Sequence, residues 1–198
     1  MNFNKEKKEF LAKKDKSRKG TIDNRIRKLV NKINSLSDFY TTSSCSGRIL
    51  FLTIPKSNKK NEVQYLLNSH KKIKYNALKK PLKTIITKIK LRKIKNDVWF
   101  KVDGAILHIA SNNINSAKKL LSTARDIGFK RSGIISVGKN RVTIELISTE
   151  KIETIVGKNK KLLVGEDYFK VLIKESNKKL EKTWKKIDKL YDRLGSIN

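Results

Sequence analysis

The stretch F-Y-T-T-S-S-C-S-G-R-I-L-F-L, residues 39–52, joins a run of small polar residues to a short apolar run. Six consecutive small side chains, from Thr41 to Ser46, carry a hydroxyl or a thiol. Such a segment is too polar for a core, so it predicts a loop that binds a hydrogen-bonding or anionic ligand. Gly47 allows close backbone approach, and Arg48 offers a planar guanidinium with five donors. An ordinary Ser/Thr-rich loop with side-chain-to-backbone hydrogen bonds is the alternative.

The surrounding pattern predicts alternating helices and hairpins. Apolar residues recur at helical spacing in five segments. These are Phe3–Leu11, Ile22–Ile33, a segment that begins after Pro81, Ala117–Ile127, and a segment that runs from Glu166 toward the C-terminus. The fourth segment lies between a capping residue, Asn112 or Asn113, and Gly128. Hairpins are predicted from the strand ending at Pro55 to Val63–Leu67, from Val98–Val102 to Ala105–Ala110 through Asp103-Gly104, and from Ile134–Val137 to Val142–Ile147. This order favours an α+β (or α/β) fold, in which helices flank a mixed β-sheet and a long helix ends the chain. We expect a single domain over residues 1–198.

The charge of the chain indicates a polyanionic partner. Its 198 residues contain 48 Lys and Arg against 18 Asp and Glu, a formal net charge of +30. Between Glu62 and Asp97 there is no carboxylate, whereas ten lysines and Arg92 occur there. This segment predicts a surface that follows the phosphates of a nucleic acid, with Lys79, Lys80, Lys83 and Lys90 as substrate contacts and Tyr65, Tyr75 and Trp99 near enough to stack on unpaired bases. The alternative is a lysine-rich composition whose charges only face solvent.

Several classes of protein are excluded by what the sequence lacks. No apolar run reaches the length of a membrane-spanning helix, and the N-terminal residues have no apolar signal core. We therefore expect a cytoplasmic protein that does not associate with a membrane. One cysteine and two histidines are too few for a structural zinc site, so we expect no metal. Neither a G-x-G-x-x-G motif nor a P-loop is present. His108 lies in an apolar strand, where a lone histidine is more often structural than catalytic.

Three stretches give the chain a resemblance to a known family. They are D-K-S-R-K-G-T-I-D at residues 15–23, F-Y-T-T-S-S-C-S-G-R-I at residues 39–49, and the segment from I-L-H-I-A to F-K-R-S-G-I at residues 106–134. In this order they resemble the tRNA wybutosine-synthesizing protein 3 family, the methyltransferases of the tricyclic wyosine bases. The segment around His70 departs from the family pattern, which has a tryptophan just ahead of a histidine.

The resemblance implies an enzyme that transfers a methyl group from S-adenosylmethionine to a ring nitrogen of a demethylated wyosine base beside the anticodon of phenylalanine tRNA. It also implies a fold unlike the common Rossmann-type methyltransferases. Ser43, Ser44, Ser46 and Arg48 are then expected to contact the cofactor, with Arg48 on the methionine carboxylate or an RNA phosphate, and Ser132 and Gly133 to complete the pocket. Lys16 and Ser17 are carried over as substrate contacts, and Asp15, Asp23 and His108 as candidate catalytic groups. A non-catalytic basic RNA-binding protein is the alternative.

Overall fold

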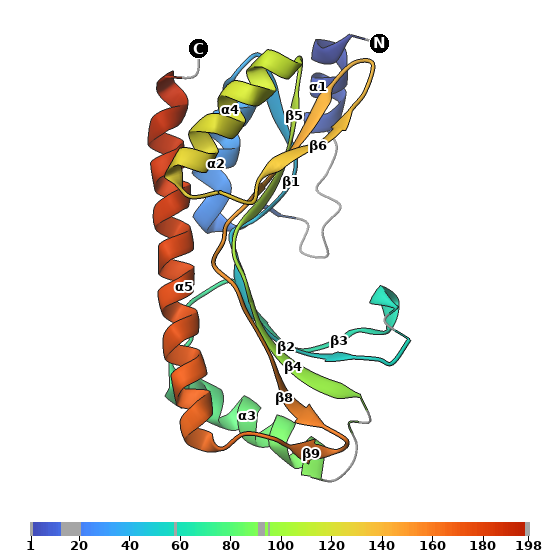
Figure 1. Cartoon of the computed structure of the whole chain (residues 1–198), viewed down its shortest axis with the longest axis vertical. Helices are drawn as coiled ribbons and strands as arrows, with labels where there is room; N and C mark the ends of the chain where they lie inside the picture. Colours follow the sequence, from blue (N-terminus) through green and yellow to red (C-terminus); the bar gives the residue numbers. More distant parts are fainter. Residues whose placement is uncertain (1, 13–20, 58, 91–93, 95, 197–198) are drawn as a thin grey trace. The chain divides into compact units, whose positions relative to one another are not determined.

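The computed structural model describes residues 2–12, 21–57, 59–90, 94 and 96–196 (Figure 1). The chain divides into two compact units, which it enters and leaves several times. Unit 1 comprises Met1–Ser46, Gly104–Thr149 and Lys182–Asn198, and unit 2 comprises Gly47–Asp103 and Glu150–Glu181. None of the helices within the described residues is both long and apolar enough to cross a membrane. The prediction of one domain over residues 1–198 concerns how the two units act together, and it stays a prediction.

Unit 1 is a four-stranded antiparallel sheet with helices on one face and a short helix on the other (Figure 1). Its strands follow the order β1-β5-β7-β6, with bounds Phe39–Cys45, Ile106–Ser111, Val142–Ile147 and Gly133–Val137. The buried stripes of α2 (Asn24–Ser35) and α4 (Ile114–Ile127) and the end of α5 (Glu166–Arg193) pack on one face. The core includes Ile33, Leu107, Leu120, Ile144 and Leu190. On the other face, Tyr40 packs against Phe3 and Phe10 of α1 (Phe3–Ala12).

Unit 2 is a five-stranded antiparallel sheet that packs one face against helices. Its order is β3-β2-β4-β8-β9, with bounds Gln64–Ser69, Arg48–Ile54, Asp97–Asp103, Ile152–Lys158 and Lys161–Leu162. Phe51 of β2 contacts Phe100 of β4 and Phe169 of α5. Helix α3 (Tyr75–Lys90) contributes Leu78, Leu82 and Ile85 to the buried residues. The short helices η1 (Lys60–Glu62) and η2 (Leu194–Ser196) complete the described elements.

The α+β class, the flanking helices and the long C-terminal helix are confirmed. The predicted mixed sheet is instead two sheets in which every strand pair of the described residues is antiparallel. The hairpin across Asp103-Gly104 is wrong: β4 pairs with β2 and β8, whereas β5 pairs with β1 and β7. β4 and β5 therefore belong to different sheets. Both edges of each strand are already paired with other strands, so β4 and β5 cannot pair with each other.

Two further predictions are corrected. The polar segment predicted as a loop is strand β1, because its backbone pairs with β5 from Phe39 to Cys45 and its hydroxyl groups lie partly on an uncovered face. Helix α3 begins at Tyr75, with Pro81 inside it, because the buried Leu78 extends the apolar stripe by one turn toward the N-terminus. Thr and Cys side chains are compatible with a pleated strand, so composition alone did not distinguish a loop from a half-buried edge strand.

Candidate active site on the four-stranded sheet

A serine, a histidine and a glutamate from three neighbouring strands form a hydrogen-bonded row on the sheet of unit 1. Ser43 lies opposite His108 in the β1–β5 pairing, and His108 lies opposite Glu145 in the β5–β7 pairing. The Ser43 hydroxyl is 2.6 Å from Nδ1 of His108, and Nε2 of His108 is 2.9 Å from Oε1 of Glu145. About a third of the His108 and Glu145 side chains is exposed, at 31% and 30%. The row is therefore accessible from solvent.

The partners of His108 determine what its ring can do. A neutral histidine carries one N–H donor and one acceptor nitrogen. Because the Glu145 carboxylate accepts from Nε2, the acceptor is Nδ1, and the Ser43 hydroxyl donates to it. A proton that reaches the Ser43 oxygen can then pass to His108, whose positive charge Glu145 stabilises. Glu145 is a candidate site residue that the sequence did not reveal, since only strand register brings it beside His108.

A β-bulge adjusts β1 so that Ser43 meets His108. The register between β1 and β5 shifts between Thr41 and Ser43, so that Thr42 is an extra residue in the strand. The Thr42 hydroxyl donates to the backbone carbonyl of His108 at 3.3 Å. The bulge therefore places Thr42 against the same residue whose side chain Ser43 contacts. Bulges of this kind often occur where a side chain must be re-aimed near a site.

Gly133 extends the row to the fourth strand. It lies opposite Glu145 in the β6–β7 pairing. A Cβ atom built on Gly133 would meet no other heavy atom within 4 Å. The end of the row beside Glu145 is thus open to an approaching molecule. Ser44 is the neighbour of Ser43 in β1 and is half-buried.

The same face is bounded by a polar cluster that holds α1 on the sheet. The Tyr40 hydroxyl donates to Glu6 at 2.8 Å and accepts from Arg141 at 2.9 Å, and Arg141 is also paired with Glu6. Burial raises the pKa of Tyr40 above its ordinary value, so the phenol stays protonated at neutral pH and remains a donor. The side chains of Tyr40, Glu6 and Arg141 all bond one another, so we interpret them as structural residues at the edge of the site.

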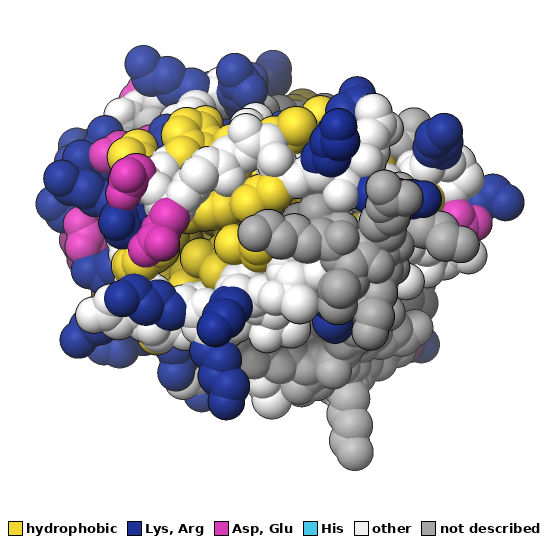
Figure 2. Space-filling view, turned by 90° about the horizontal axis from the view of Figure 1, so that it is seen from below, with side chains coloured by type: hydrophobic (Ala, Val, Ile, Leu, Met, Phe, Trp, Pro, Cys, Tyr) yellow, Lys and Arg dark blue, Asp and Glu magenta, His cyan; other side chains and the backbone are white. Residues whose placement is uncertain are grey.

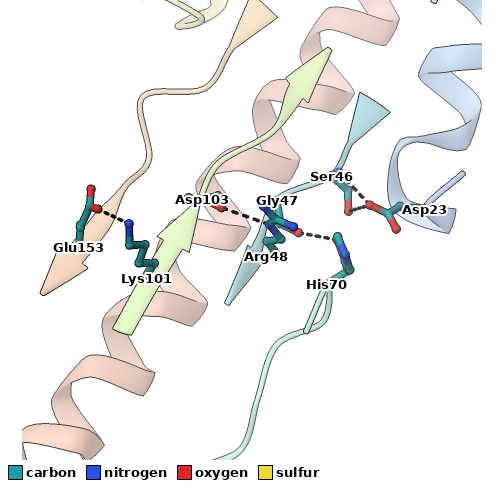
Figure 3. A network of polar contacts seen from close by, with 8 residues as sticks. All are labelled: Asp23, Ser46, Gly47, Arg48, His70, Lys101, Asp103 and Glu153. Atoms are coloured by element: carbon teal, nitrogen blue, oxygen red, sulfur yellow. Dashed lines mark hydrogen bonds and ion pairs between the residues drawn. The ribbon is translucent and has the colours of Figure 1, made fainter. Parts of the chain in front are cut away.

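Asp23 and Ser46 are held together inside unit 1 (Figure 3). The Asp23 carboxylate accepts from both the backbone N–H and the hydroxyl of Ser46, each at 3.1 Å. The indole N–H of Trp184 donates to the Ser46 carbonyl at 3.1 Å. Ser46 is fully buried and Asp23 nearly so. The hydroxyl proton of Ser46 is thus committed to Asp23, so this hydroxyl could contact a cofactor only by accepting a hydrogen bond.

Ser132 has a similar internal role. Its hydroxyl accepts from the backbone N–H of Ile147 at 2.9 Å, and its carbonyl accepts from Arg125 at 2.7 and 3.2 Å. The backbone N–H of Ser132 donates to the Phe129 carbonyl at 3.1 Å. The hydroxyl, the carbonyl and the backbone N–H of Ser132 are thus all bonded within unit 1, and its contribution to a cofactor pocket stays a prediction.

In unit 2, Arg48 and His70 each contact groups near the start of β2 (Figure 3). Nε of Arg48 donates to Asp103 at 3.1 Å, and its guanidinium carbon lies 6.0 Å from the ring centroid of Tyr65. Nδ1 of His70 lies 3.1 Å from the carbonyl oxygen of Gly47. The φ of Gly47 is 93°, a backbone conformation that favours glycine.

The predicted RNA contacts lie on α3, where Lys79, Lys80 and Lys83 are exposed. Within the described part of the chain, none of these three lysines is paired with a carboxylate. Figure 2, viewed from the end that carries α3 in Figure 1, shows Lys and Arg side chains around the rim and hydrophobic side chains in a band between them. The side chain of Lys90 and the whole of Asp15, Lys16 and Ser17 lie outside the described residues.

Comparison with known proteins identifies the family of the chain. The family model described as Methyltransferase TYW3 matches residues 5–196. The chain belongs to this family. The resemblance seen in the sequence is thereby confirmed, and the protein is an enzyme of the methyltransferase TYW3 family.

Relatives in two archaea match over nearly their full length. The tRNA(Phe) 7-((3-amino-3-carboxypropyl)-4-demethylwyosine(37)-N(4))-methyltransferase 1 of Pyrococcus furiosus is 32% identical over 198 residues, covering 100% of this chain and 97% of the relative. The corresponding methyltransferase of Thermococcus sibiricus is 35% identical over 200 residues, covering 99% of this chain and 96% of the relative. A solved structure of a Pyrococcus horikoshii protein matches with a TM-score of 0.86 at 30% identity, covering 100% of this chain and 96% of that one. The fold of the chain is therefore that of this solved structure.

Proposed function

We propose that the protein uses S-adenosylmethionine to N-methylate the tricyclic 4-demethylwyosine-type base beside the anticodon of phenylalanine tRNA, in wybutosine or wyosine biosynthesis. The names of its relatives, which specify that base and tRNA(Phe), support this substrate. The observation that carries the proposal within the molecule is the Ser43–His108–Glu145 row. Methylation of a ring nitrogen requires that nitrogen to lose a proton, and the row offers an accessible path for it.

The residues of unit 1 fit a sulfonium cofactor. S-adenosylmethionine supplies, when bound, a methyl group on a positively charged sulfur. The carboxylate of Glu145 favours a positive charge nearby, and Gly133 leaves open space beside it. The hydroxyl of Ser43 can serve as a hydrogen-bonding partner for a polar group of the cofactor, whereas Ser44 lies opposite the core residue Leu107 and points to the other face of the sheet. We assign Ser46 and Ser132 to the support of this surface, since their polar groups are bonded internally.

The chain's own residues supply proton transfer and positioning. Ser43 accepts the proton of the attacking nitrogen while it donates its own hydroxyl proton to Nδ1 of His108. Glu145 holds the ring in the orientation and tautomer that this transfer requires. The remaining acceleration comes from holding the two reactants in line, which requires rigid supports. The β-sheet supplies such support, because Ser43, His108 and Glu145 all lie on paired strands.

Labelled methyl transfer tests the proposal. The protein is incubated with methyl-labelled S-adenosylmethionine and tRNA from a strain that lacks this methyltransferase. We expect label in the tRNA, at the wyosine-type base. The alternative, a non-catalytic basic RNA-binding protein, predicts that the tRNA binds but takes up no label.

We expect the replacement of Arg48 with alanine to weaken the binding of one anionic partner by about tenfold or more, since hydrogen bonds to charged groups are strong. The partner is either the methionine carboxylate of the cofactor or a phosphate of the RNA. Titration calorimetry with S-adenosylmethionine and a separate tRNA titration show which affinity falls. The control is Arg131→Ala, at an exposed arginine of unit 1. Unchanged affinity for both partners would rule out Arg48 as a ligand contact.

The lysines of α3 are expected to bind the tRNA backbone. Replacing Lys79, Lys80, Lys83 and Lys90 together with glutamine should weaken tRNA binding and flatten its salt dependence. The logarithmic slope should fall by roughly one unit for each phosphate that is no longer bound. Phosphate contacts carry no sequence information, so the site of methylation should not change. Filter binding over a series of salt concentrations measures the slope.

A variant with the same loss of charge provides the control for this set. Lys118, Lys119, Lys130 and Lys139 are exposed lysines of unit 1, and their replacement with glutamine removes four charges elsewhere. If both quadruple variants flatten the salt dependence equally, only net charge matters and α3 has no special role. If neither changes it, the lysines of α3 only face solvent.

A further inference from the structure

Two aromatic side chains lie in one row across the sheet of unit 2. Tyr65 of β3 is opposite Leu52 of β2, Leu52 is opposite Trp99 of β4, and Trp99 is opposite Ile155 of β8. Paired residues of neighbouring strands point to the same face of a sheet. Phe51, the neighbour of Leu52, points to the other face, where it packs on Phe169 of α5. The row therefore lies on the face of the sheet that is turned away from α5.

The row forms a half-open apolar surface. The Tyr65 side chain is 45% exposed, Leu52 is almost completely buried, and Trp99 and Ile155 are half-buried. Tyr65 and Trp99 flank Leu52, so two strand spacings, roughly 10 Å, separate their positions in the sheet. Two planar side chains on either side of an aliphatic one provide two stacking positions above a hydrophobic base.

Each aromatic ring of the row has a cation close to it. The guanidinium carbon of Arg48 lies 6.0 Å from the Tyr65 ring centroid, and Nζ of Lys101 lies 5.2 Å from the Trp99 ring centroid. Acidic residues orient both cations: Asp103 bonds Arg48, and Glu153 pairs with Lys101 (Figure 3). Hydrogen bonds from Lys101 and Lys151 hold the pKa of Glu153 below its ordinary value, so Glu153 is ionised at neutral pH and retains Lys101.

We propose that this aromatic row, Tyr65–Leu52–Trp99–Ile155, binds unpaired RNA by stacking two bases on Tyr65 and Trp99, with Arg48 and Lys101 next to the sugar-phosphate chain. Bases can stack on aromatic side chains only when they are unpaired and splayed out. The net charge of +30 selects a polyanion, and the paired cations place positive charge beside each ring. The identity of the RNA as the unpaired loop of the tRNA substrate rests on the proposed function; the binding of unpaired RNA does not.

The test uses a fluorescently labelled RNA heptanucleotide, single-stranded or annealed to its complement, without a methyl donor. Tyr65→Ala and Trp99→Ala are each expected to weaken binding of the single strand by about tenfold or more, as loss of one stacked base does. Binding of the duplex should change by less than about twofold. The salt dependence should keep its slope, because stacking releases no counterions, which separates this surface from the lysines of α3.

Two control variants separate a loss of RNA binding from a loss of folding. Tyr168→Ala removes a tyrosine of similar exposure, 43%, from α5 in the same unit, and it should bind both RNAs as the unmodified protein does. Trp99→Phe keeps an aromatic ring and should retain affinity within a few-fold. Quenching of tryptophan fluorescence by unlabelled single strand should occur in the unmodified protein and be lost in Trp99→Phe.

Three outcomes would overturn the inference: unchanged single-strand affinity in Tyr65→Ala and Trp99→Ala, equal losses for single strand and duplex, or the same loss in Tyr168→Ala. These outcomes are separate from the failure of the proposed function. A protein that methylates tRNA while its Tyr65 and Trp99 variants bind unpaired RNA normally would retain the function and lose this surface. A protein that takes up no label but shows the expected stacking would retain the surface and lose the function.

Discussion

Replacing His108 with glutamine is expected to lower the rate constant of methyl transfer by about 10²- to 10⁴-fold, the usual contribution of a general base. Glutamine preserves the size of the side chain and its capacity to bond Ser43 and Glu145, but it cannot take up a proton. Affinity for tRNA should not change, because the row contributes proton transfer and not phosphate contacts. Single-turnover transfer of labelled methyl, with both substrates saturating, measures the effect directly.

Variants of neighbouring residues serve as controls for the loss of activity in His108→Gln. Ser136→Ala removes an exposed hydroxyl from β6 of the same sheet and should leave the rate unchanged. Glu145→Gln should reduce the rate less than His108→Gln, since the neutral amide no longer stabilises the positive charge that the ring carries once it has taken up the proton. A His108→Gln variant with normal turnover would remove His108 from the mechanism. The base would then have to be sought among Asp15 and Asp23.

Replacing Asp23 with alanine is expected to lower the free energy of unfolding by about 2–6 kcal/mol, because it leaves two buried donors unsatisfied and each costs about 1–3 kcal/mol. The substitution leaves the buried N–H and hydroxyl of Ser46 without their acceptor. Urea denaturation followed by tryptophan fluorescence is a suitable measurement, because the Trp184 indole donates to the carbonyl of the same serine.

The comparison with Ser46→Ala makes the assignment of Asp23 testable. That variant removes the serine hydroxyl but keeps the backbone N–H bonded to Asp23, so we expect a loss of only about 1 kcal/mol. If Asp23→Ala unfolds at the same urea concentration as the unmodified protein but transfers no methyl group, Asp23 is catalytic and its bonds to Ser46 are secondary. Loss of stability with residual turnover would identify it as a structural residue.

Local signals in the sequence predicted the elements whose ends are set by nearby residues. The buried stripe of α2, the Gly128 cap of α4 and the β6–β7 hairpin follow from residues within a few positions of one another. Of the two predicted N-caps of α4, Asn112 and Asn113, the structure has Asn113. The Asp103-Gly104 turn failed because its two strands have better partners elsewhere in the chain. β8 was not predicted at all, since its residues Ile152–Lys158 alternate only weakly between buried and exposed positions.

The candidate site could be predicted only in part. The sequence identified Ser43 and His108 separately, one from a polar run and the other from its resemblance to a family, but not as neighbours. Their contact depends on the pairing of residues 65 positions apart. Glu145 has no local signal beyond its place on the polar side of V-T-I-E-L-I, so its role depends on the same long-range register. Site residues on adjacent strands therefore become visible only when strand order is known.

The bulge at Thr42 also affects how this strand should be aligned with others. Counting in steps of two from Tyr40 selects Ser44 as the residue on the tyrosine's face, whereas the inserted residue changes the frame and selects Ser43. A chain without Thr42 would keep Tyr40 opposite Ala110 and Ser43 opposite His108, with an uninterrupted ladder. A chain that lost one residue after Ser43 would keep Ser43 opposite His108 but shorten the connection from β1 to β2. In a sequence alignment, a one-residue gap at Thr42 and a one-residue gap after Ser43 thus have different structural consequences, although the two gaps are equally long.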